Sequence, residues 1–166
     1  MAYPPPRVAC PEEPVALLSV SSREEDHASL RRILCDTNWE VVEVSVGRDA
    51  KPKLLAHKTP VVIFAANVFD GEWNLLLAGA RQLPDPPKLI VSLRAVNDRF
   101  WAEIPNLGCY DVLARPYMAE EVRRVVGLAW NRWNRECENR FAHPKPPASA
   151  PRVADTPYRT RTGKAG

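Results

Sequence analysis

We expect the fold to be arranged around residues 59–73, Thr59-Pro-Val-Val-Ile-Phe-Ala-Ala-Asn-Val-Phe-Asp-Gly-Glu-Trp73. Residues 61–64 form a continuous apolar run, which is typical of a strand buried on both faces in the middle of a parallel sheet. Residues 67–71 are a turn signal, and the run over 72–83 predicts a helix. Strand, short loop and helix make half of a βαβ unit, in which ligands gather at the carboxyl end of the strand. The residue expected at that end is Ala65.

The rest of the middle of the chain repeats this alternation of strands and helices. Short apolar runs predict four more strands, over residues 15–20, 39–46, 88–93 and 109–114. Helical patterns are found over about residues 22–36, 97–104 and 118–138, with a weaker one over 49–57. The order βαβαβαβαβα predicts the α/β fold class, with a parallel sheet covered by helices on both faces and joined by right-handed crossovers.

The first predicted helix has an acidic start. Ser22-Arg-Glu-Glu25 fits a capping box, in which the hydroxyl and the glutamate each bind a free backbone N–H of the first turn. Residues 24–26 are all acidic and are predicted to lie in that turn, where acids favour the helix dipole. A shifted alignment that makes them metal ligands is the alternative interpretation. We expect His27 on the helix surface.

The two ends of the chain differ in composition from its middle. Residues 1–14 and 139–166 each hold five prolines. Neither end has the apolar content to offset the entropy of ordering, so we expect a disordered arm, a folded domain over 15–138 and a disordered basic tail. The tail has a net charge of +5, the arm −1 and the middle −1, which together give the +3 of the whole chain. The basic balance therefore describes the tail and not the domain.

Several classes of protein are disfavoured by the sequence. Cys10, Cys35, Cys109 and Cys137 lie far apart, which favours a reduced protein with small buried thiols over a disulfide framework or a metal site. We find no signal peptide and no apolar run of membrane length, so we expect a cytoplasmic protein that does not bind membranes. Glycine-rich phosphate loops and nucleophile elbows are also missing. We predict a protein that is not an enzyme and has neither cofactor nor metal.

Over about residues 15–135 the chain resembles the receiver domain of bacterial two-component response regulators. The resemblance rests on anchors in the family's order: Ser21-Ser22 after the first strand, Asp70-Gly71 after the third, Ser92 at the end of the fourth, and Gly108 followed by Asp111-Val-Leu-Ala-Arg-Pro-Tyr117. It implies a flavodoxin-like three-layer sandwich, with five parallel strands in the order 2-1-3-4-5.

The resemblance also implies a phosphotransfer pocket, from which this sequence departs. In family members, an aspartate at the end of strand three accepts a phosphoryl group. Two acids after strand one hold Mg²⁺, and a lysine and a hydroxyl contact the phosphoryl group. Matched onto this chain, the aspartate is Ala65, the acids are Ser21 and Ser22, and the lysine is Arg115. An aspartyl phosphate needs a carboxylate nucleophile, and Mg²⁺ usually needs at least one carboxylate. We therefore expect a degenerate pocket.

Two further positions bear on this pocket. Ser92 keeps the family's hydroxyl, whereas Val112 stands where a switch aromatic is common. In the loop after the third strand, Asp70 is interpreted as part of an Asp-Gly turn, with a rescuing phosphoacceptor as the alternative.

Val112, Tyr117 and Trp130 are candidate interface residues. Trp130 lies at the margin of the apolar stripe of the last helix, beside arginines, and Trp and Arg dominate interface hot spots. A core-edge tryptophan is the alternative. By analogy with receivers, we expect a homodimer through the face between the fourth strand and the last helix.

The sequence thus favours a stand-alone degenerate receiver, a signalling or protein-interaction module whose partner it does not name. The alternative is a nucleic-acid-associated protein acting through residues 139–166, although the spaced charges of this tail favour a solvated linker. A small flavodoxin-like enzyme is a third hypothesis that no motif supports.

Overall fold

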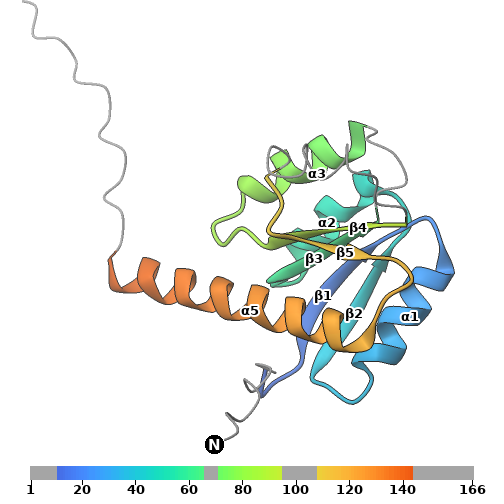
Figure 1. The fold of residues 1–166 in the computed structure, drawn as a ribbon. Coiled ribbons are helices and arrows are strands. Elements are labelled where there is room, and N and C mark those ends of the chain that lie inside the picture. Colours follow the sequence, from blue (N-terminus) through green and yellow to red (C-terminus); the bar gives the residue numbers. More distant parts are fainter. Residues whose placement is uncertain (1–10, 66–70, 95–107, 144–166) are drawn as a thin grey trace, which may run out of the picture.

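The computed structural model describes residues 11–65, 71–94 and 108–143, and confirms the predicted sheet. Five parallel strands pair in the order β2-β1-β3-β4-β5 (Figure 1). The strands are β1 (Val15–Val20), β2 (Trp39–Val44), β3 (Val61–Ala65), β4 (Lys88–Leu93) and β5 (Asp111–Ala114). The helices are α1 (Glu24–Leu34), α2 (Ala50–Ala56) after the short 3₁₀ helix η1 (Gly47–Asp49), α3 (Gly71–Arg81) and α5 (Ala119–Ala142).

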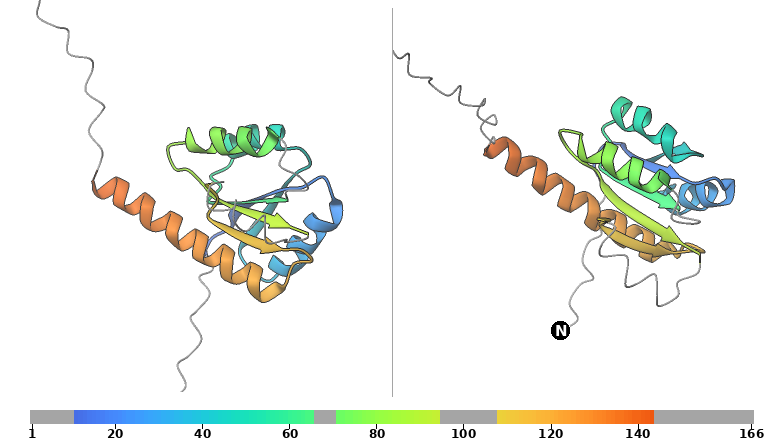
Figure 2. Two further views of the ribbon diagram at one scale, coloured as in Figure 1. Left: turned by 45° about the horizontal axis from the view of Figure 1, so that its top comes forward. Right: turned by 90° about the horizontal axis from the view of Figure 1, so that it is seen from above.

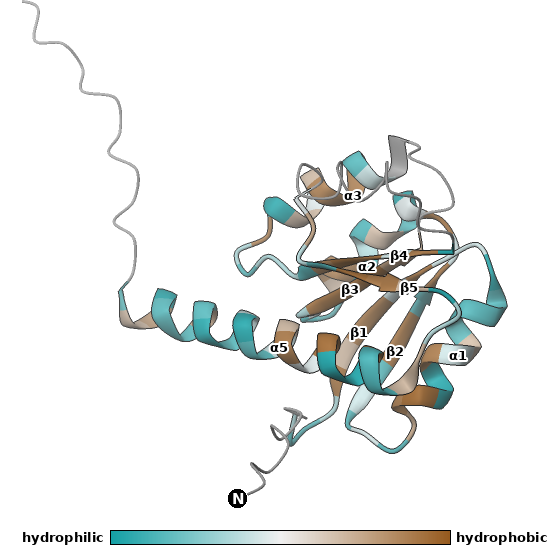
Figure 3. Cartoon of the chain, in the orientation of Figure 1, coloured by the Kyte–Doolittle hydropathy of each residue, from teal (hydrophilic) through white to brown (hydrophobic). Residues whose placement is uncertain are grey.

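Helices cover both faces of the sheet and make three layers (Figure 2). On one face, α1 and α5 pack on alternate strand residues such as Leu17, Ile63 and Ile90. On the other face, α2 and α3 cover the intervening residues, including Phe64 and Val91. The sheet is therefore apolar on both sides, and in Figure 3 its strands are mostly brown, whereas the helices combine hydrophilic and hydrophobic residues.

The central strand is β3, as its sequence predicts. All five of its residues are buried, and it pairs with β1 on one side and with β4 on the other. In that register Ala65, its last residue, lies beside Ser92 of β4. The position of β3, the strand with the clearest sequence signal, thus determines which residues lie together at the carboxyl end of the sheet.

Several predicted boundaries are corrected. Helix α1 begins at Glu24 with Arg23 as its N-cap and no side-chain cap, so the capping box at Ser22 does not form. The last helix was predicted to begin at about Met118, but α5 begins at Ala119, and Met118 is its N-cap and is 66% exposed. Cys35 is exposed, contrary to the expectation of buried thiols. The helix predicted over 97–104 lies outside the described residues.

Helix α5 continues four residues beyond its predicted end at Glu138, and its second half extends past the sheet (Figure 1). Side-chain contacts tie this half to the segment that leads into β4. Lys88 donates to Glu136 at 2.6 Å, and Arg140 pairs with Asp85 at 3.2 Å. Burial acts to raise the pKa of Glu136, but hydrogen bonds from Lys88 and Arg132 outweigh it and lower the pKa.

Candidate functional site

The predicted pocket residues meet at the carboxyl end of the sheet. Ser21 directly follows β1, Ala65 ends β3, Ser92 lies in β4 and Arg115 follows β5. Ser21, Ser92 and Arg115 are all buried. Because parallel strands end at the same edge, residues far apart in the chain come together there.

An ion pair between Asp26 and Arg115 occupies the middle of this site. The Arg115 Nη1 atom donates to Asp26 Oδ2 at 2.8 Å, and the Ser21 hydroxyl donates to the same oxygen at 2.6 Å. The Asp26 and Arg115 side chains are only 8% and 2% exposed. Charge-assisted hydrogen bonds of this length in a water-poor site hold both partners firmly. The carboxylate of Asp26 is therefore already bound by Arg115 and Ser21.

Asp26 was interpreted as a residue of the first turn, with a role as metal ligand as the alternative, and its pairing with Arg115 was not predicted. The acids at 24–26 do lie in the first turn of α1, as predicted, but Asp26 points into the protein and Glu24 and Glu25 do not. A signal was present, because Asp26 lies one helical turn before the buried Leu30 and so falls on the packing face. The Ser21 hydroxyl also accepts the Arg23 N–H at 3.1 Å. Ser21, and not the predicted cap Ser22, thus makes the hydrogen bonds at the start of α1.

His27 is buried, and the prediction of a surface position is wrong. Its Nδ1 lies 2.8 Å from the Ser19 hydroxyl, and its Nε2 lies 3.0 Å from the Ser21 carbonyl oxygen. A carbonyl only accepts, so Nε2 carries the proton, and in the neutral ring Nδ1 accepts from Ser19. His27 thereby joins α1 to Ser19 of β1 and to Ser21, a residue of the site.

The second hydroxyl of the site is bound as well. Ser92 Oγ lies 2.8 Å from the phenol oxygen of Tyr117, the residue that follows the cis Arg115–Pro116 bond. Burial raises the pKa of Tyr117 to about 12; the hydrogen bond to Ser92 opposes the rise, and the charge of Asp26 adds to it. Tyr117, a predicted interface residue, thus contacts the pocket.

Replacing Tyr117 with phenylalanine is expected to cost about 1–2 kcal/mol of stability, because Ser92 loses its partner in a buried site. The wild-type phenol should titrate at about pH 12. Its pKa is raised by folding, so the stability it contributes is present below the ordinary tyrosine value and is lost as the pH rises through the folded pKa. Ultraviolet titration of the phenolate and chemical denaturation measure both effects. Unchanged stability and an unchanged titration curve in Tyr117→Phe would contradict this geometry.

The remaining predicted positions differ in their exposure to solvent. Ser22 is exposed, and Val112 packs on the face that α2 and α3 cover. Trp130 is half-buried and meets Trp39 edge to face, with ring centroids 6.4 Å apart. It is thus at the edge of the core formed by α1 and α5.

Within the described residues, no three His, Cys, Asp or Glu side chains are grouped so that they could hold a metal ion. The same part of the chain holds no helix that is both long and apolar enough to cross a membrane. Asp70, the loop residue considered as an alternative phosphoacceptor, lies outside the described ranges.

Comparison with solved structures identifies the fold. The receiver domain of an HD domain-containing protein from Pseudomonas fluorescens Pf-5 is 23% identical with a TM-score of 0.66, over 80% of this chain and 98% of that chain. A response regulator from Thermotoga maritima is 15% identical with a TM-score of 0.63, over 70% and 98%. The Vibrio cholerae chemotaxis protein CheY4 is 17% identical with a TM-score of 0.60, over 69% and 98%.

These likenesses show that the chain has the fold of a response regulator receiver domain. No protein-family model matches the sequence, and no curated protein matches it.

Proposed function

We propose that this protein is a stand-alone degenerate receiver, a signalling module of two-component type that acts by binding other proteins and is not phosphorylated on the usual aspartate. The observation that carries the proposal is the pairing of Ala65 with Ser92 at the carboxyl end of β3. A methyl group stands where the fold's chemistry would require a nucleophilic carboxylate.

The Asp26–Arg115 pair supports the same proposal. A cation that is meant to contact an incoming phosphoryl group must be available to it, and Arg115 donates to a carboxylate of its own chain. A phosphoryl group entering this site would have to displace that pair at the cost of leaving a buried carboxylate uncompensated. Asp26 thereby supplies from within the protein the negative charge that phosphorylation would bring.

The proposed partner is another protein, or a second copy of this chain, on the face between β4 and α5. Tyr110 and Leu128 are exposed large side chains near this face, at 39% and 48%. Trp130 contacts Trp39, which favours a role at the core edge over that of a free anchor. The proposed location is the cytoplasm. No contact of the described residues favours the nucleic-acid alternative.

Acetyl phosphate with Mg²⁺ tests the proposal. We expect no acid-stable, hydroxylamine-labile phosphoryl adduct on the full chain by intact mass, while a receiver that has the acceptor aspartate is labelled in parallel. An adduct on this chain would overturn the proposal. Repeating the reaction with Asp26→Asn would then show whether Asp26 is the acceptor, and mapping would test the loop carboxylate Asp70.

A further inference from the structure

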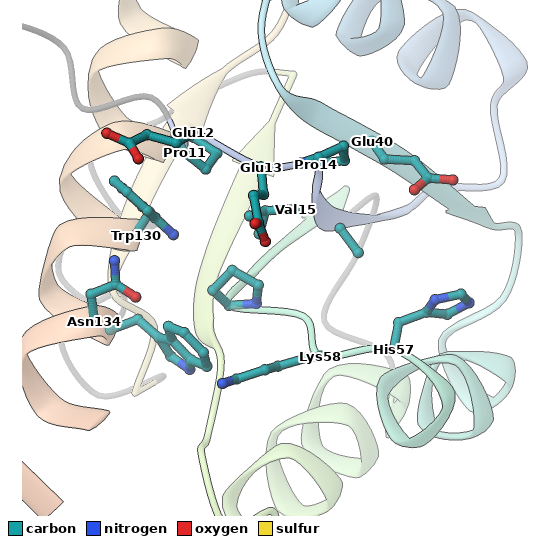
Figure 4. A pocket seen from close by; sticks show the side chains of 13 residues that line it. Pro11, Glu12, Glu13, Pro14, Val15, Glu40, His57, Lys58, Trp130 and Asn134 are labelled. Carbon is teal, nitrogen blue, oxygen red and sulfur yellow. The ribbon is translucent and has the colours of Figure 1, made fainter. Parts of the chain in front are cut away.

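A groove of about 680 Å³ lies at the opposite end of the sheet from the degenerate pocket. It is bordered by the start of β1, the segment before β3 and the middle of α5. Figure 4 shows Trp130 and Asn134 of α5 on one side, with His57 and Lys58 on another. Nothing in the proposed receiver function uses this groove.

The walls of the groove combine aromatic, proline and acidic side chains. Trp130 is half-buried, Trp133 forms part of the wall, and Pro11 and Pro14 add flat apolar surface. A second hollow of about 260 Å³ shares His57, Lys58 and Trp133 with it. The two hollows therefore form an extended surface with the shape that a peptide needs rather than a compact pocket for a small molecule.

The rim of the groove is acidic. Glu12, Glu13 and Glu40 all line it and are exposed to solvent. The Lys58 ammonium lies 5.1 Å from the centre of the Trp133 ring, where a cation–π contact holds it beside the wall. A ligand with several positive charges and an apolar or proline-rich backbone therefore fits both walls and rim.

We propose that this groove binds the chain's own basic, proline-rich segment, residues 144–166. That segment holds five prolines, and its basic residues outnumber its single acid, Asp155; they are Lys145, Arg152, Arg159, Arg161 and Lys164. Proline-rich segments bind aromatic-lined grooves because their extended backbone is pre-organised, and neighbouring basic residues pair with acids on the rim. This inference is independent of the proposed function.

The segment begins close enough to reach the groove. Asn134 lines the groove, and α5 ends at Ala142, two turns later or about 12 Å further along the helix. An extended chain spans about 3 Å per residue, so a few residues after His143 suffice to return to the groove. Attachment at this distance gives the segment a high effective concentration, and binding within one chain is favoured over exchange between copies.

Zero-length carbodiimide coupling of the full chain tests the proposal, because it joins a lysine only to a carboxylate that it touches. We expect Lys145 or Lys164 to be coupled to Glu12, Glu13 or Glu40 in the monomer, independent of protein concentration and suppressed by high salt. Coupling confined to dimers would overturn binding within one chain. Coupling spread over unrelated acids such as Glu25 would overturn the site.

Two triple variants distinguish a specific contact of the segment from a general effect of lowering the positive charge of the protein. Arg152→Gln/Arg159→Gln/Arg161→Gln keeps both reactive lysines and should lower coupling to the groove roughly fivefold or more, since each exposed ion pair contributes a few-fold in affinity. The matched control, Arg32→Gln/Arg48→Gln/Arg124→Gln, changes three exposed arginines elsewhere and should leave coupling unchanged. Equal loss in both variants would overturn the proposal.

Nuclear magnetic resonance gives a readout that does not depend on the coupling chemistry. The indole N–H signal of Trp130, assigned by Trp130→Phe in the full chain, should shift in the segment variant and not in the control. The signal of the buried Trp73, on the far face of the sheet, should be unchanged in both. A Trp130 signal that does not move would contradict occupancy of the groove.

Discussion

Arg115→Ala is expected to destabilise the protein by about 3–5 kcal/mol, because it leaves the carboxylate of Asp26 buried without its partner. The Asp26 Oδ2 atom receives only two hydrogen bonds, from Arg115 and Ser21, among the contacts seen in the site. Removing the guanidinium takes away the only one of these donors that carries a charge. Chemical denaturation followed by circular dichroism measures the loss.

Two variants serve as controls for Arg115→Ala. The double variant Asp26→Leu/Arg115→Met replaces both charges with apolar groups and should recover most of the lost stability, since an isosteric apolar pair avoids the desolvation cost. Arg132→Ala breaks a pair whose arginine is 64% exposed and should change stability by less than about 1 kcal/mol. If Arg115→Ala cost no more than Arg132→Ala, the buried pair would not stabilise the fold as proposed.

Trp133→Ala is expected to cost about 3–5 kcal/mol through the cavity that it leaves between α5 and the segment before β4. Trp133 is 5% exposed, its indole N–H makes a long hydrogen bond of 3.5 Å to the Asp85 carbonyl, and Lys58 lies over its ring. It lies near the point where α5 passes the edge of the sheet, so its loss should also loosen the helix beyond it.

Hydrogen exchange separates the two effects of Trp133→Ala. Amides after Trp133 in α5 should exchange faster in this variant, whereas those around Val122 and Val125, buried near the start of the helix, should keep their relative protection. Trp133→Phe keeps most of the volume and should cost clearly less. Equal stability of Trp133→Ala and the wild type would show that the second half of α5 is not anchored by this residue.

The sheet could be predicted from the sequence because its signals are local. The unbroken apolar run of β3 can only be buried on both faces, and short loops then fix a parallel alternation of strands and helices. The positions of Ala65, Ser92 and Arg115 at one edge follow from that topology alone. The order of strands and helices along the chain was therefore sufficient to predict that these residues lie together.

The ion pair between Asp26 and Arg115 could not be predicted in the same way. Asp26 and Arg115 are far apart in the chain, and no local rule shows that they pair. The local rule that was applied, capping by Ser22, competes with burial, and burial prevailed because Asp26 and His27 lie on the same side of α1 as Leu30 and Leu34. A polar residue within an apolar stripe signals a buried hydrogen-bond partner, which Ser19 provides for His27.

We propose that the pair of Asp26 and Arg115 closes the carboxyl end of the sheet to Mg²⁺ and to a phosphoryl group. Titration of the full chain with Mg²⁺, in the presence and absence of beryllofluoride, measures this most directly when followed by thermal unfolding and tryptophan fluorescence. Closure by Asp26 and Arg115 predicts no saturable change in either signal. A saturable increase in the unfolding temperature that needs both Mg²⁺ and beryllofluoride would contradict it and would define a working phosphoryl switch.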